Sequence, residues 1–247
     1  MIVKQHGAHT RRGQLRLLSN HPSLPYLCGM IVLPPLNEMV MLNGEVTPET
    51  IDAFLADFEL KLRAKPDTLF IWICSQGERV EQAIRAYNRI RRSRVRVVTY
   101  NALSVASAAN VVYCAGHQRC KKAGARFFFH AMTTRWHNGK PSRPYTLDDL
   151  LNLNNAVRRN RISEQDRLSV EQDLQKPSGD ALMEELRRSI RKHRRQRRRF
   201  IDIVSGTGLS RTRIEELMSD TELKALTEAD EQLYVNAECS LPPPPLL

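Results

Sequence analysis

The sequence predicts an α/β domain whose sheet is mainly parallel. Short apolar runs at 39–42, 69–74, 95–99 and 127–129 have the length of strands, and segments with apolar residues at helical spacing lie between them. A continuous apolar run such as 69–74 is typical of a strand that is buried on both faces. The alternation favours parallel strands joined by helices, in a chain of 247 residues that is long enough to bury a core.

Three helices are expected between these strands. Thr47-Pro48 has the form of a helix cap followed by proline at the first helical position, and apolar residues recur at helical spacing over 51–62. A second helix is expected over 80–90 from the same spacing. The segment 106–115 is rich in alanine and other small residues, which predicts a third, buried helix.

The remainder of the chain is more polar and more helical. We expect a loop over 133–145, a helix over 146–170, a long helix over 181–204 and a short helix over 210–217. Apolar positions thin out in the middle of the long helix, so this middle is expected to face solvent or a partner. The predicted organisation is an N-terminal arm (1–37), an α/β domain (38–235) with an inserted, mostly helical segment around 135–180, and a proline-rich disordered tail (236–247).

The positive charge of the chain is concentrated in one segment. The formal net charge is +11, and nine of the 38 Lys and Arg residues lie in 187–199, which contains no acidic residue. The rest of the chain is nearly neutral, with 29 basic and 27 acidic residues. An electrostatic partner would therefore have to bind at 187–199. This segment has no interleaved aromatic residue for base stacking, and we therefore do not expect a nucleic-acid partner.

The cysteines and the apolar runs indicate a cytoplasmic protein. Five cysteines at irregular spacing argue against a disulfide framework, and Cys74 and Cys114 lie in apolar runs typical of core residues. No apolar run approaches the roughly 20 residues of a membrane span, and the first residues lack the pattern of a secretion signal.

Three features are candidates for chemistry, and each also has a simpler structural interpretation. Ser107 follows a predicted buried strand and begins a small-residue helix, where it could be an exposed nucleophile or only a helix cap. His130 closes the apolar run 127–129 at the rim of the sheet, where active sites of α/β proteins gather, although it could be a core histidine. Gly77 directly follows another buried strand and could present a backbone amide to a ligand or simply form a turn.

Taken together, these features resemble the ClpP-like serine peptidases. The resemblance rests on a strand followed by Ser75-Gln76-Gly77, a small-residue helix that bears Ser107, Ala115-Gly116 nine residues later, and a strand that ends at His130. It covers about 39–132 and 181–235. It implies the ClpP/crotonase-like fold of repeated β-α units, with the long helix 181–204 as the handle that joins two rings.

The family pattern implies a role for each candidate residue. Ser107 would be the nucleophile, His130 the general base and then the general acid, and Asp220 the carboxylate that orients the histidine, with Glu222 as the alternative. The amides of Gly77 or Glu78 and of Ala108 would form the oxyanion hole. Glu78 stands where the family has a second glycine, and its Cβ restricts the backbone conformation that aims this amide.

The resemblance also implies partners and leaves an alternative open. It predicts a homo-oligomeric ring, typically a heptamer stacked into a tetradecamer, that hydrolyses peptides or unfolded proteins without a metal or cofactor. The arm 1–37 does not resemble the family's axial loops, so the resemblance does not extend to docking of an AAA+ unfoldase. The alternative function is a catalytically inactive scaffold or regulatory subunit of the same fold, which Glu78 and the uncertain acid motivate.

Overall fold

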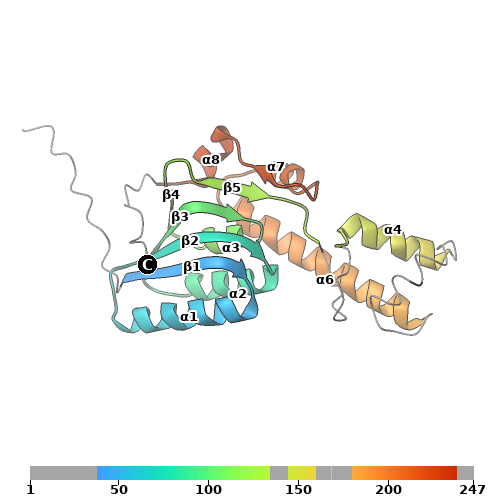
Figure 1. The fold of residues 1–247 in the computed structure, drawn as a ribbon, viewed down its shortest axis with the longest axis horizontal. Helices are drawn as coiled ribbons and strands as arrows, with labels where there is room; N and C mark the ends of the chain where they lie inside the picture. Colours follow the sequence, from blue (N-terminus) through green and yellow to red (C-terminus); the bar gives the residue numbers. More distant parts are fainter. Residues whose placement is uncertain (1–37, 134–143, 160–167, 169–179, 238–247) are drawn as a thin grey trace, which may run out of the picture. The chain divides into compact units, whose positions relative to one another are not determined.

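The computed structural model describes residues 38–133, 144–159, 168 and 180–237. The predicted arm, most of the predicted inserted segment and nearly all of the predicted tail lie outside these residues. Within them the structure is an α/β fold (Figure 1).

The sheet is mainly parallel, as the sequence predicts. Its strands are ordered β1 (Met39–Val46), β2 (Thr68–Glu78), β3 (Arg96–Ala106), β5 (Arg126–Phe129) and β6 (Lys224–Ala225), and β4 (Gln118–Lys121) also pairs with β3. All neighbouring pairs are parallel except β5 and β6. Parallel strands place their carboxyl ends at one edge of the sheet, which is where ligands bind in open α/β folds.

The first two helices between the strands begin where the sequence predicts, and the third begins at Ala109 rather than at 106. α1 (Pro48–Arg63) has a capping box at Thr47, and its buried face carries Phe54 and Phe58. α2 (Val80–Arg91) follows β2 directly, and α3 (Ala109–Tyr113) follows β3. Figure 1 shows α1 and α2 along the same side of the sheet. The main core lies between this side of the sheet and these helices, and the apolar faces of both contribute to it.

The long helix α6 (Asp180–Ser205) packs against two separate parts of the chain. Near its C-terminal end, Phe200 and Val204 belong to the main core. Near its N-terminal end, Leu186 and Ile190 form a second cluster with residues of and before α4 (Leu147–Arg158). The sequence predicts that the middle of this helix faces solvent or a partner, but His193 there is only 2% exposed and is buried within the chain itself. Burial lowers the pKa of His193 to about 4, which keeps its imidazole neutral near pH 7.

Some elements differ from the sequence-based predictions. β3 extends to Ala106, well beyond the predicted strand 95–99, and the third helix is correspondingly shorter than predicted. α7 (Arg211–Leu217) matches the predicted short helix, whereas β4, β6 and α8 (Glu228–Tyr234) are not predicted. β4 is not predicted because its sequence is polar. Its Arg119 is nevertheless buried, since the guanidinium donates hydrogen bonds to the Tyr234 and Thr207 carbonyl oxygens.

The states of the cysteines agree only in part with the sequence-based predictions. Cys114 is a buried free thiol as predicted, Cys74 is free but only partly buried, and Cys120 is disulfide-bonded, which its spacing does not predict. In the ranges that the structure describes, every helix is too short or too polar to cross a lipid bilayer.

Candidate active site

Ser107 and His130 follow two paired strands at the same edge of the sheet. Ala106, the last residue of β3, pairs with Phe128 on β5, and the strands are parallel. The Ser107 N–H donates a hydrogen bond to the Phe128 carbonyl oxygen, with an N–O distance of 3.0 Å. The fold therefore places the two residues after neighbouring carboxyl ends, and both side chains are partly exposed.

The turn at Ser107 has an unusual backbone conformation. Ser107 has φ +51°, a left-handed conformation that is uncommon for a residue with a side chain. The N-cap of α3 is Ala108, and no side chain caps this helix, so the structure does not support the interpretation of Ser107 as a cap. Strained backbone is frequent at functional sites, where the surrounding structure holds it in place.

The side chain of Asn110 anchors this turn through hydrogen bonds. Its side-chain Nδ2 donates to the carbonyl oxygens of Ser107 (3.1 Å) and Phe128 (2.9 Å), and its Oδ1 accepts from the Tyr234 hydroxyl (3.1 Å). Asn110 is fully buried, and its bonds tie the turn to β5 and α8. Sequence reasoning missed this positioning residue, and the only available signal was a single amide side chain within an apolar helix.

Gly77 is pressed directly against the turn. Gly77 has φ +86°, and a Cβ at this position would lie 2.6 Å from both the Ala106 carbonyl oxygen and the Ala108 nitrogen. Only glycine allows β2 to approach so closely. The Gly77 N–H donates to the buried Ser75 hydroxyl at 3.1 Å. Among the described residues the Ala108 N–H has no acceptor, as expected for an amide before the first turn of a helix.

Glu78 adopts a conformation that is typical of glycine. Its φ is +136°, in a region that residues with a side chain rarely occupy. The Cβ of Glu78 therefore does not prevent the glycine-like backbone at this position. The unfavourable φ of Glu78 is a local backbone strain next to the candidate oxyanion hole.

Replacing Glu78 with glycine is expected to raise the free energy of unfolding by about 1 kcal/mol. Relief of the strained φ outweighs the extra backbone freedom that glycine gives the unfolded chain. Urea unfolding measures this change. The matched control is Glu45→Gly on β1, where φ is not positive and glycine should destabilise the protein by about 0.5–1 kcal/mol. Equal destabilisation by the two changes would contradict the strain at Glu78.

His130 has the tautomer that a general base requires. Its Nδ1 lies 2.7 Å from the carbonyl oxygen of Ala131, and since a carbonyl only accepts, Nδ1 must carry the proton. In the neutral imidazole the lone pair is then on Nε2, the atom that could take a proton from a nucleophile. This assignment comes from the hydrogen bond itself.

Asp220 approaches His130 through its backbone. The Ala131 N–H donates to the Asp220 carbonyl oxygen, while the exposed Asp220 carboxylate accepts from the Glu222 N–H at 3.3 Å. Within the described residues no hydrogen bond joins the Ser107 hydroxyl to His130 or the Asp220 carboxylate to the ring. The structure thus brings Gly77, Ser107 and Ala108 together, with His130 directly after the neighbouring strand β5, and the role of Asp220 stays a prediction.

No metal-binding group accompanies this site in the described part of the chain, where no three His, Cys, Asp or Glu side chains gather closely enough to hold an ion. The chemistry that the arrangement itself offers is nucleophilic. A hydroxyl on a strained turn, an imidazole after the neighbouring strand and an unpartnered amide are groups that acyl transfer uses.

Comparisons with known proteins connect this geometry to one family. Residues 35–141 match the family model of Clp protease. A point mutant of ClpP1 from Listeria monocytogenes shares the fold with TM-score 0.54 and 19% identity, over 82% of this chain and 91% of that chain. A peptidase from Plasmodium falciparum does so with TM-score 0.52 and 11% identity, over 81% and 94%. No curated protein matches the sequence.

Proposed function

We propose that this chain, whose residues 35–141 match the Clp protease family model and whose fold resembles that of ClpP1, is a ClpP-like serine endopeptidase. The observation that supports the proposal best is the contact of Gly77 with the strained turn at Ser107, beside strand β5, which His130 directly follows. Left-handed residues other than glycine cluster at active sites, ligand clamps and switch regions, so this conformation supports a functional role for the turn.

In the proposed reaction, Ser107 Oγ attacks the carbonyl carbon of the scissile peptide bond. His130 Nε2 accepts the hydroxyl proton and then delivers it to the leaving amine, which produces an acyl-enzyme that water hydrolyses. The negative charge on the carbonyl oxygen is stabilised by the Ala108 N–H, with the amide of Glu78 or Gly77 as the second donor. The reaction uses the chain's own residues.

We further propose that the protein acts on peptides or unfolded proteins as a homo-oligomeric ring in the cytoplasm, with α6 as the handle between rings. The experiment that tests the function is hydrolysis of fluorescent casein and of short fluorogenic peptides by the purified assembly. Turnover supports the peptidase. An absence of turnover in every assembled state of a folded protein would contradict it.

The second candidate function is a catalytically inactive ClpP-like scaffold. Its support is the missing hydrogen bond between Ser107 and His130, together with an Asp220 carboxylate that bonds to Glu222 rather than to the imidazole. A scaffold assembles with active family members but hydrolyses nothing alone. Mixing experiments with separately purified rings distinguish the two functions.

Asp220→Asn is expected to lower turnover far more than Glu222→Gln. Asp220 is anchored beside His130 by the hydrogen bond from the Ala131 N–H, and loss of the carboxylate partner in a triad costs about 10⁴ in rate. Steady-state hydrolysis of one fluorogenic peptide by both variants measures the ranking. Equal and mild losses would instead establish a dyad, in which the Ala131 carbonyl alone orients the imidazole.

A further inference from the structure

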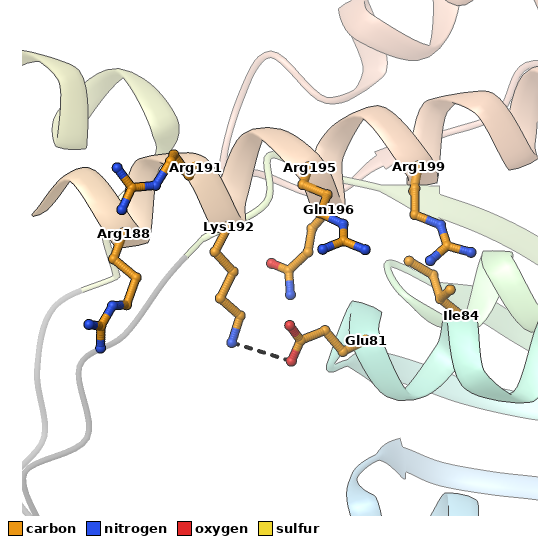
Figure 2. A pocket seen from close by; sticks show the side chains of 8 residues that line it. All are labelled: Glu81, Ile84, Arg188, Arg191, Lys192, Arg195, Gln196 and Arg199. Carbon is orange, nitrogen blue, oxygen red and sulfur yellow. Dashed lines mark ion pairs between the residues drawn. The ribbon is translucent and has the colours of Figure 1, made fainter. Parts of the chain in front are cut away.

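A basic groove lies between α6 and the beginning of α2 (Figure 2). Its volume is about 450 Å³, and its α6 wall carries five cationic side chains: Arg188, Arg191, Lys192, Arg195 and Arg199. The α2 wall contributes Glu81 and the apolar side chain of Ile84. Five of the nine basic residues at 187–199 therefore share one concave surface, which the reaction described above does not use.

Two contacts fix how the helices run along this groove. The Lys192 Nζ lies 3.3 Å from a Glu81 carboxylate oxygen, and the Arg199 guanidinium donates to the Asn88 Oδ1 at 3.5 Å. The partners are seven residues apart on each helix, so α6 and α2 run parallel and in step over about two turns. The part of α6 before Lys192 therefore continues past the first turn of α2.

This geometry directs one end of the groove toward the candidate active site. α2 begins at Val80, three residues after Gly77, so its first turn lies at the carboxyl edge of the sheet. Arg188 and Arg191 lie on the part of α6 that continues beyond this turn. From the other side, Phe200 of α6 packs edge-on against Phe129, the residue before His130, with ring centroids 6.1 Å apart.

The cations of the groove are available to an external anion. Arg188 and Arg191 pair with Glu185 and Glu184 of their own helix, but their side chains are 66% and 65% exposed, and such surface pairs contribute little to stability. In the described part of the chain, Arg195 forms no ion pair. A ligand carboxylate can therefore exchange with these partners or bind Arg195 at small cost.

The lining of the groove favours an acidic peptide over a nucleic acid. The groove has no aromatic side chain on which a base could stack. Its cations at 188, 192, 195 and 199 follow one another at roughly 4.5–6 Å along the helix axis. Side chains on one face of an extended peptide repeat at about 6.6–6.8 Å, a comparable spacing, and guanidinium groups bind carboxylates through paired hydrogen bonds.

We propose that this groove binds acidic residues that flank the scissile bond of the substrate, so that the enzyme selects acidic segments of unfolded chains. The inference rests on the proposed peptidase function and adds its substrate class. Selection is expected because one end of the groove is directed toward the sheet edge where Ser107 and His130 lie. An acidic flank then helps to position the peptide bond for attack.

The test compares two fluorogenic peptides of equal length whose flanks carry either Asp and Glu or Asn and Gln. The groove variant is Arg191→Gln with Arg195→Gln. The matched control is Arg194→Gln with Arg198→Gln, which removes the same charge at the same spacing from exposed positions of α6 that do not line the groove. The wild type is expected to favour the acidic peptide in kcat/KM by about tenfold, mainly through KM.

The groove variant should lose this preference, and the control should retain it. The preference of the wild type should also decrease in high salt, because exposed charges are screened. Equal loss in both variants would overturn the proposal, since it would show a general effect of net charge. Equal kcat/KM values of the wild type for the two peptides would overturn it as well.

A binding measurement separates this proposal from the peptidase function. Fluorescence anisotropy with a fluorescein-labelled acidic peptide is measured on Ser107→Ala protein, with and without the groove substitutions. Weaker binding only in the groove variant supports the acidic site even if the wild type hydrolyses no peptide, in which case the peptidase function fails alone. Tighter binding of single-stranded RNA than of the acidic peptide would overturn the proposal.

Discussion

Replacing Ser107 with alanine is expected to reduce peptide hydrolysis by about 10⁴-fold or more, because the change removes the oxygen that we propose attacks the carbonyl carbon. The fold should survive, since alanine and serine have the same backbone restrictions at φ +51°. Steady-state hydrolysis of a fluorogenic peptide measures the loss. Thermal unfolding and sedimentation velocity confirm that the variant folds and assembles as the wild type does.

Wild-type turnover by the Ser107→Ala variant would remove this residue from the reaction. Ser104 would then be the next candidate, although it lies within β3 and pairs with Arg126 rather than standing at the end of the strand. The Ser104→Ala variant therefore serves as the matched control. It is expected to retain turnover within a few-fold of the wild type.

Gly77→Ala is expected to have the largest structural effect of any single methyl group at this site. The added carbon would lie 2.6 Å from two backbone atoms and 2.8 Å from the Ser107 Cβ, so either β2 or the turn at Ser107 must move. We expect a loss of about 3 kcal/mol in the free energy of unfolding and of at least about 10²-fold in turnover. Urea unfolding and peptide hydrolysis measure the two effects.

Gly124→Ala provides the control for Gly77→Ala. Gly124 has nearly the same φ, +79°, but an added Cβ would meet no atom within 4 Å. Only the conformational penalty of about 1 kcal/mol applies there, and turnover should not change. If the two variants lose equal stability and both retain turnover, β2 does not support the turn at Ser107 as the structure indicates.

The core βα units of the fold could be predicted from the sequence because their signals are local. Apolar runs with the length of strands and helical spacing over 51–62 and 80–90 are sufficient to indicate β1, α1, β2 and α2. The strands β4 and β6 depend instead on partners that are distant in the chain. The buried Arg119 in β4 is stabilised by carbonyls of residues 88 and 115 positions later, which no local pattern reveals.

For the candidate site, too, the residues could be predicted from the sequence but their geometry could not. Gly77, Ser107 and His130 could be selected because each follows an apolar run, where a parallel sheet exposes its functional edge. Their mutual geometry could not be predicted, since the φ values of Ser107 and Glu78 and the anchoring by Asn110 arise from packing between elements. The tautomer of His130 depends on one contact with the Ala131 carbonyl, and residue identity alone does not indicate it.

The most direct test of the peptidase function is to map the residue that a fluorophosphonate probe modifies. An activated serine attacks the phosphorus atom, fluoride leaves, and the resulting adduct is located by mass spectrometry of proteolytic fragments. We predict a single adduct on Ser107 of the assembled wild-type protein, which is lost in the His130→Ala variant because the serine then lacks its base. An adduct on another residue, or no adduct in any assembled state, would contradict the assignment of Ser107 as the nucleophile of a ClpP-like peptidase.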